Sequence, residues 1–151
     1  QQLFSETLPL VEPLLQNKNV SLRAQITDNV YVYADRYRIQ TALLNIFQNS
    51  LEAMERGGDI VIAGKLSEHE GFVSISVADS GVGMPPDFVQ KAFAPFFSTK
   101  RDGSLRGLGL AIVSDIVKIH NGKIEVKSSP SRGTSVFLHL PIAKQESYAK
   151  I

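Results

Sequence analysis

Two glycines at the start of an amphipathic segment could form a phosphate-binding site. Gly107 and Gly109 flank Leu108, and the apolar spacing after them predicts a helix that ends at Asn121 and Gly122. The free N–H groups and the positive dipole end of such a helix can hold an anion. Position 112 is Ile, so the G-x-G-x-x-G pattern is incomplete, and the chain contains no G-x-x-x-x-G-K-[ST] motif. The glycines therefore predict a phosphate-binding helix N-terminus, but one that is neither a Rossmann nor a Walker motif.

A second glycine-marked stretch, ADSGVGMPP, could hold a flat base. Asp79 ends an apolar strand pattern, and Gly81 and Gly83 flank Val82. A carboxylate at a strand end can accept a hydrogen bond from an exocyclic amine, and glycines let backbone and ligand approach closely. Val82 and Met84 would add apolar contact, as in pockets that suit adenine. Strands that end in Asp and turn on glycines are also common without a ligand, so the residues alone leave both interpretations open.

Two asparagines share one face of the longest predicted helix, residues 35–55, which Asp35 would cap and Gly57 would stop. At about 100° per residue, the stripe expected to face a sheet consists of Ile39, Leu43, Ile46, Ser50 and Met54. Beside it lies a polar wedge of Arg38, Asn45, Asn49 and Glu52. A carboxamide oxygen suits a hard cation such as Mg²⁺. A solvated polar face is the alternative that the wedge by itself favours.

The stretch FAPFFSTK, residues 93–100, combines three phenylalanines with a polar and basic end. The phenylalanines predict a small apolar anchor that pins a loop to the domain. The ammonium of Lys100 could reach a terminal phosphate from such a loop, and Arg106 adds positive charge beside the glycines at 107 and 109. Lys100 is therefore a candidate phosphate contact.

The composition indicates one folded cytosolic domain. The chain has 151 residues, 43% of them hydrophobic, which is enough to bury a core. Its net charge of +1 is not that of a dedicated nucleic-acid binder, and the lack of cysteine excludes disulfides and thiolate metal sites. No apolar run approaches the length that crosses a bilayer. Because the sequence begins with Gln rather than Met, we expect a cytoplasmic piece of a longer parent, whose anchoring in a membrane the sequence leaves open.

The remaining patterns predict the elements that position these residues. Helical spacing covers 3–19, with a kink expected at Pro13. The predicted strands are 20–26, 30–34, 59–66, 72–79, 123–129 and 134–141, the last four forming two hairpins. The long connection 80–106, with one short helix after Pro86, is typical of a binding loop or lid. The polar tail after Pro141 is expected to fray. These elements predict a single α+β domain with helices on one face of a mainly antiparallel sheet.

Taken in order, five stretches resemble the motifs of a known family: NIFQNSLEAM, DSGVGM, FAPFFSTK, GLGLAI and GTSVFL. They resemble the N, G1, F, G2 and final glycine motifs of the catalytic ATP-binding domain of sensor histidine kinases, relatives of DNA gyrase, Hsp90 and MutL. The PFFSTK stretch is most similar to the short lids of kinases related to the nitrogen-regulation sensors. The resemblance covers nearly the whole chain, to Pro141. It implies a Bergerat-type two-layer α/β sandwich with a mixed, mostly antiparallel sheet, a helix at 1–18, an adenine loop and flexible ATP lid at 80–106, and a tail at 142–151.

The resemblance also implies residue roles. Asn45, Asn49 and Lys100 would be the catalytic residues: Asn49 as the Mg²⁺ ligand, Asn45 near the phosphates and Lys100 at the terminal phosphate. Asp79 would take the adenine amine, with support from Thr134 through a water. The other implied nucleotide contacts are Gly81, Val82, Gly83, Met84, Phe97, Gly107, Leu108, Gly109 and Leu110. Arg106 stands where the family commonly has a small residue, and we expect it to face solvent rather than phosphate.

The function implied is that of a domain that binds ATP and Mg²⁺ and transfers the γ-phosphoryl group to a histidine. That histidine would lie on a separate dimerisation domain of the same parent, for relay to the receiver domain of a response regulator. None of His69, His120 and His139 lies in the pattern of such an acceptor. We therefore expect this chain to be a monomer that binds ATP, does not bind nucleic acid and does not phosphorylate itself appreciably.

Three other functions compete with this interpretation. Hydrolases of the family use a Glu one helical turn before the metal-binding Asn as a general base, and here that position is Asn45, which cannot take a proton. A kinase of protein serine is harder to exclude, although the FSTK lid favours the histidine kinase. A scaffold without ATP is disfavoured because Asn49, Asp79 and the glycines are all present.

Overall fold

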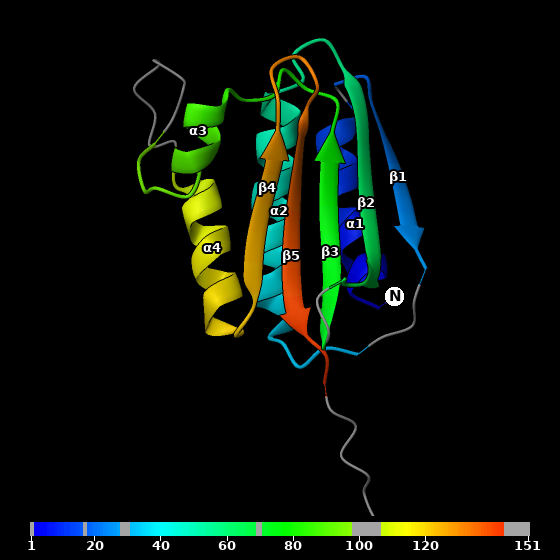
Figure 1. Ribbon diagram of the computed structural model, residues 1–151. Helices are drawn as coiled ribbons and strands as arrows, with labels where there is room; N and C mark the ends of the chain where they lie inside the picture. The colour runs from blue at the N-terminus through cyan, green and yellow to red at the C-terminus, as the bar shows by residue number, and fades with distance from the viewer. Residues whose placement is uncertain (1, 17, 28–30, 69–70, 98–106, 144–151) are drawn as a thin grey trace, which may run out of the picture.

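The computed structural model describes residues 2–16, 18–27, 31–68, 71–97 and 107–143. Within them, one sheet has helices on one face only, so that the domain has two layers (Figure 1). The helices are α1 (Gln2–Leu15), α2 (Arg36–Glu52), α3 (Pro86–Lys91) and α4 (Gly109–Ile119). The strands are β1 (Val20–Ile26), β2 (Gly58–Leu66), β3 (Phe72–Asp79), β4 (Lys123–Ser128) and β5 (Thr134–Pro141). The expected α+β sandwich is confirmed.

The sheet has the strand order β1-β2-β3-β5-β4. β1 pairs with β2 in parallel, because α2 carries the chain back between them, whereas the other three pairings are antiparallel. The two predicted hairpins, β2 with β3 and β4 with β5, are both present. β3 and β5 are neighbours, and their register sets Asp79 directly opposite Thr134. The end of β3 and the start of β5 therefore lie side by side at one edge of the sheet.

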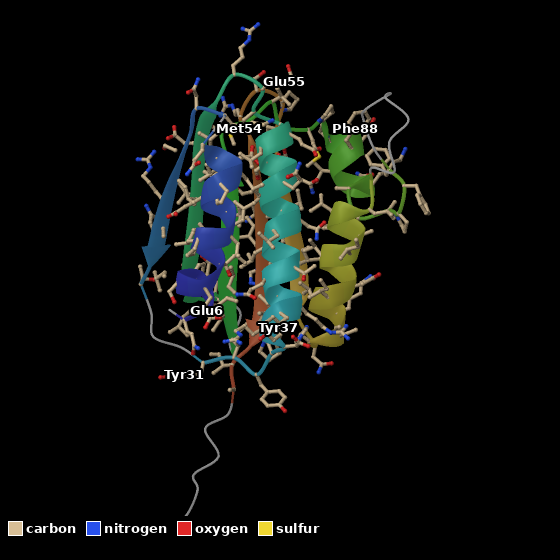
Figure 2. All side chains as sticks on the ribbon, turned by 180° about the vertical axis from the view of Figure 1, so that it is seen from behind. Glu6, Tyr31, Tyr37, Met54, Glu55 and Phe88 are labelled. Carbon is tan, nitrogen blue, oxygen red and sulfur yellow. The ribbon has the colours of Figure 1, made fainter. Side chains whose placement is uncertain are left out.

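The core lies between the sheet and the helices. Alternate residues of the central strands face the helices and are buried, as the period of two in a strand requires. The predicted stripe is buried as well: Ile39, Leu43, Ile46 and Ser50 on α2, and Met54 just after it. Figure 2, seen from the helical side, shows α1, α2 and α4 side by side across the sheet, with Tyr37 near one end of α2 and Met54 at the other. The period-3.6 interpretation of this helix is confirmed, and Asp35 caps it by accepting a hydrogen bond from the Arg38 N–H.

The predicted strand at 30–34 is wrong for the residues described. Only Val32 pairs, in a single bridge with Ile142, although the alternation of VYVYA is that of a strand. Tyr31 and Tyr33 are 78% and 92% exposed, so neither packs against the core to hold a longer ladder. The end of the long helix also differs, because α2 stops at Glu52 rather than near residue 55.

No helix within the described ranges is both long and apolar enough to cross a membrane.

Candidate functional site

A cavity of about 500 Å³ opens between α2, α4 and the ends of β3 and β5. This volume lies in the range of small-molecule sites. The predicted site residues that line it are Asn45, Asn49, Asp79, Val82, Gly83, Met84, Phe97, Gly107, Leu108, Gly109, Leu110 and Thr134. In Figure 2 the cavity's end of the molecule is marked by Glu55, from the segment after α2, and by Phe88 on α3. Residues from all five motifs therefore meet around one cavity.

Asp79 stands at the end of β3 with its carboxylate fixed by three hydrogen bonds. Its Oδ1 accepts from the main-chain N–H groups of Gly81 at 2.9 Å and Thr134 at 3.1 Å. Its Oδ2 accepts from the Ser50 hydroxyl at 2.9 Å. An acceptor held in this way at a cavity wall is complementary to an N–H donor on a ligand.

Thr134 supports Asp79 through its main chain, which needs no bridging water. Its hydroxyl lies 2.9 Å from Ser128 Oγ, and Ser128 Oγ also accepts from the Met84 N–H at 2.8 Å. This network ties the Met84 wall of the cavity to the hairpin of β4 and β5. The water-mediated contact between the Thr134 side chain and Asp79 stays a prediction.

Gly81 and Gly83 shape the loop that follows β3 in different ways. Gly81 is buried and does not line the cavity, but its N–H orients Asp79. Gly83 has φ +67°, and a Cβ on it would overlap the Ser129 carbonyl, so only glycine fits without strain. Val82 between them lines the cavity and is 68% exposed, which leaves apolar surface for a planar ligand.

The N-terminus of α4 faces the two asparagines of α2. A Cβ on Gly109 would lie 3.2 Å from Asn49 Nδ2 and 3.5 Å from Asn45 Oδ1. Leu108, at the N-cap position, provides no side-chain hydrogen bond to the first turn. The positive end of α4 is therefore directed to the same cavity wall as the carboxamides.

The aromatic anchor differs from the prediction. Phe97 lines the cavity and packs edge-on against Phe88 of α3, with ring centroids 5.5 Å apart. Phe96 has φ +64° and is 71% exposed, so its expected place in the anchor is wrong and Phe88 takes that role. The Phe96 N–H donates to the Gly107 carbonyl at 3.0 Å, so its main chain is held beside the start of the α4 segment while its side chain is exposed. The predicted contacts of Lys100 and Arg106 lie outside the described residues.

Ser50 is a site residue that the sequence reasoning missed. The helical period places it on the sheet-facing stripe of α2, and it is only 3% exposed, but its hydroxyl reaches Asp79 at the cavity. The available signal was a hydroxyl on an otherwise apolar stripe, because a buried hydroxyl needs a partner.

Comparison with known proteins gives a consistent result. Residues 34–144 match the family described as histidine kinase-, DNA gyrase B- and HSP90-like ATPase. The sensor histidine kinase ZraS of Klebsiella oxytoca is 42% identical over 115 residues, which are 76% of this chain and 24% of ZraS. The catalytic domain of histidine kinase ThkA is 32% identical, with a TM-score of 0.80 over 93% of this chain and 92% of that domain. ThkA in complex with the response regulator protein TrrA is also similar, at 30% identity and a TM-score of 0.75, over 93% of this chain and 39% of that chain.

Proposed function

The chain belongs to the histidine kinase-, DNA gyrase B- and HSP90-like ATPase family, as a catalytic ATP-binding domain of the sensor histidine kinase type, and from that premise we propose how it works. It binds ATP with Mg²⁺ in the cavity between α2 and α4. It then presents the γ-phosphoryl group to a histidine on a separate dimerisation domain of the same parent. The chain spans about a quarter of ZraS, so both the acceptor and the relay belong to the proposal.

The observation that carries the proposal is the placement of two kinds of binding group on one cavity. The fixed Asp79 carboxylate is an acceptor for the adenine amine, while the α4 N-terminus and the asparagines of α2 suit phosphates. Val82 and Met84 supply apolar surface beside Asp79. This is the arrangement that a nucleotide with a polar base edge, a flat face and a charged tail requires.

The residues present fit a magnesium ion. Asn49 provides a hard carboxamide oxygen at the cavity, next to Gly109 at the start of α4. Mg²⁺ takes few protein ligands and completes its shell with phosphate oxygens and waters. Bound in this way, the ion would neutralise phosphate charge during transfer. Asn45 would orient the phosphates, because its Nδ2 is fixed by donation to the Thr41 carbonyl at 2.9 Å.

The geometry favours transfer to an external histidine over the alternatives. Asn45 is a carboxamide at the place where a hydrolase needs a base, so activating water there lacks a proton acceptor. Within the described residues, His120 is bonded to the main chain of α2 and α4, and His139 lies buried in β5 beside Ser67. Neither is placed to receive a phosphoryl group. The ThkA complex with TrrA supports a relay to a response regulator, which we infer for the parent of this chain.

Titration of Mg²⁺-ATP into the chain by calorimetry tests the adenine pocket, with Asp79→Asn as the variant. The Asn oxygen must stay at Oδ1, where two main-chain N–H groups donate, so its NH₂ replaces Oδ2 and opposes the adenine amine. We expect affinity to fall by about 100-fold. Asp115→Asn, an exposed change on α4, is the matched control and should bind normally.

Phosphoryl transfer is tested separately. Radiolabelled ATP is mixed with the chain and a histidine-bearing dimerisation domain from a similar kinase such as ZraS. We expect an acid-labile phosphohistidine on that domain and none on the chain itself. ATP binding without transfer to any dimerisation domain, or release of phosphate to water alone, would contradict the kinase proposal.

A further inference from the structure

Among the residues that the structure describes, Ser50 provides the one hydrogen bond from a side chain to the Asp79 carboxylate. The other two bonds to this carboxylate come from main-chain N–H groups, of Gly81 and Thr134, and both end on Oδ1. The Ser50 hydroxyl is the one donor to Oδ2 in the described part of the chain, at 2.9 Å. It comes from α2, so it also joins the helix layer to the end of β3.

These bonds determine how many places Asp79 leaves for a ligand. An ionised carboxylate has about four acceptor positions, two on each oxygen. Within the described residues, Oδ1 has two donors and Oδ2 has one. One position on Oδ2 therefore remains, and its direction is fixed because Ser50 stops the carboxylate from turning.

A single fixed acceptor distinguishes bases by their polar edge. A 6-amino purine offers an N–H to it, whereas a 6-oxo purine presents an oxygen that the carboxylate repels, and a purine without a substituent leaves it unpaired. Without Ser50, the carboxylate stays bonded at Oδ1 but Oδ2 has no protein donor, so its free position can swing away from the ligand.

We propose that Ser50 is a positioning residue that gives this site its selectivity for the 6-amino group of the purine. The inference rests on the proposed function, because it requires the base to lie at Asp79. It assigns to a residue on the core-facing stripe of α2 an effect on ligand choice rather than on packing alone. Ser50 acts only through Asp79, which makes the contact with the ligand.

The test compares two nucleotides that differ only in the amino group. Wild type and Ser50→Ala are titrated with Mg²⁺-ATP and with the Mg²⁺ complex of purine riboside triphosphate, which lacks the 6-amino group. We expect Ser50→Ala to weaken ATP binding about tenfold and to change purine riboside triphosphate binding less than twofold. The preference of the wild type for ATP over the analogue should shrink by the same tenfold factor.

Ser114→Ala is the matched control. Ser114 is 4% exposed, lies on α4 and does not line the cavity, so it loses a buried hydroxyl away from Asp79. Both affinities should remain at the wild-type level in this variant. Urea unfolding of all three proteins checks that each is folded at the titration temperature.

The outcomes separate the inference from the function beneath it. If Ser50→Ala binds ATP like the wild type, or loses affinity for both nucleotides equally, the positioning role is overturned and the ATP site stands. If the folded wild type binds neither nucleotide, the proposed function fails and this inference fails with it.

Discussion

At the scale of single residues, Gly109 shows how closely α4 approaches the proposed phosphate site. A side chain there would press on the carboxamide of Asn49, at 3.2 Å from Nδ2 and 3.3 Å from Oδ1. Gly109 is the first residue of α4 and has no positive φ, so its backbone does not demand glycine. Glycine is required at this position because Asn49 of the neighbouring helix α2 lies so close. Gly83 is the opposite case, since its φ of +67° means that the backbone conformation itself requires glycine there.

We predict that Gly109→Ala separates stability from binding. Alanine is favoured over glycine in a helix by about 1 kcal/mol, so the free energy of unfolding should stay level or rise. Affinity for Mg²⁺-ATP should fall severalfold, because Asn49 must move. Urea unfolding and calorimetry measure the two quantities.

Gly83→Ala provides the contrast for this experiment. Its positive φ and the Ser129 carbonyl should lower the free energy of unfolding by at least about 1 kcal/mol. Equal losses of stability in the two variants, or unchanged ATP affinity in Gly109→Ala, would show that the approach of α4 to Asn49 is not what the position requires.

At the scale of elements, α2 and α4 are fastened to each other at both ends. At one end Gly109 lies against Asn49, and at the other the His120 ring reaches the start of α2. His120 Nε2 accepts from the Asp35 N–H at 2.9 Å, and Nδ1 lies 2.7 Å from the Ile116 carbonyl, to which it must donate. The ring is therefore the neutral tautomer with its proton on Nδ1. The His120 side chain therefore bonds to the last turn of α4 and to the N-cap residue of α2.

Two substitutions of His120 distinguish its two bonds. Glutamine can place an acceptor near the position of Nε2, whereas asparagine can replace only the nearer donor, Nδ1. If the bond between helices matters more, His120→Asn should lower the free energy of unfolding by about 1 kcal/mol and His120→Gln by less. Urea unfolding followed by far-UV circular dichroism measures both. A larger loss in the glutamine variant would assign the role to the local bond with Ile116.

The elements also show what a sequence reveals and what it does not. The face of α2 could be predicted because Ile39, Leu43 and Ile46 repeat with the period of a helix, and the hairpins because alternation and turn residues are local signals. The prediction of a strand at 30–34 was wrong because alternation alone does not show whether the side chains of Tyr31 and Tyr33 pack against a core. The parallel pairing of β1 with β2 depends on packing between distant segments, which no local pattern records.

In the candidate site, too, some residues could be predicted from the sequence and others could not. The motifs identified Asp79, Asn49 and Gly109 as residues of one site, and the structure brings these three to one cavity. The partners that fix them were not predictable, since Ser50 and Asp79 meet only after α2 has settled on the sheet. The contact of Phe97 with Phe88 rather than with Phe96 was not predictable either, because it joins α3 to the segment that follows it.

At the scale of the whole molecule, the cavity joins both layers. Its walls come from α2 and α4 on one side and from β3 and β5 on the other. A bound nucleotide would therefore contact segments that must all separate on unfolding. Binding to the folded state alone stabilises it by an amount that the ligand concentration and affinity determine.

We predict a rise in Tm when Mg²⁺-ATP is present at about 100 times its Kd. The stabilisation would be about 2.7 kcal/mol, which for a domain of this size raises Tm by roughly 5 to 10 °C. Scanning calorimetry measures the shift. Asp79→Asn at the same ATP concentration should show almost none, and an equal shift in that variant would place the nucleotide elsewhere.

The contact between Phe96 and Gly107 has a consequence for how this domain tolerates change. The Phe96 nitrogen and the Gly107 carbonyl oxygen lie 3.0 Å apart, so these two residues are held side by side. Doubling the length of the segment between them adds only about 0.6 kcal/mol of loop-closure entropy. A foreign sequence, even a fluorescent protein, could therefore be inserted between Phe96 and Gly107, with both of its ends held beside the cavity. Such a fusion could report whether the cavity holds a nucleotide.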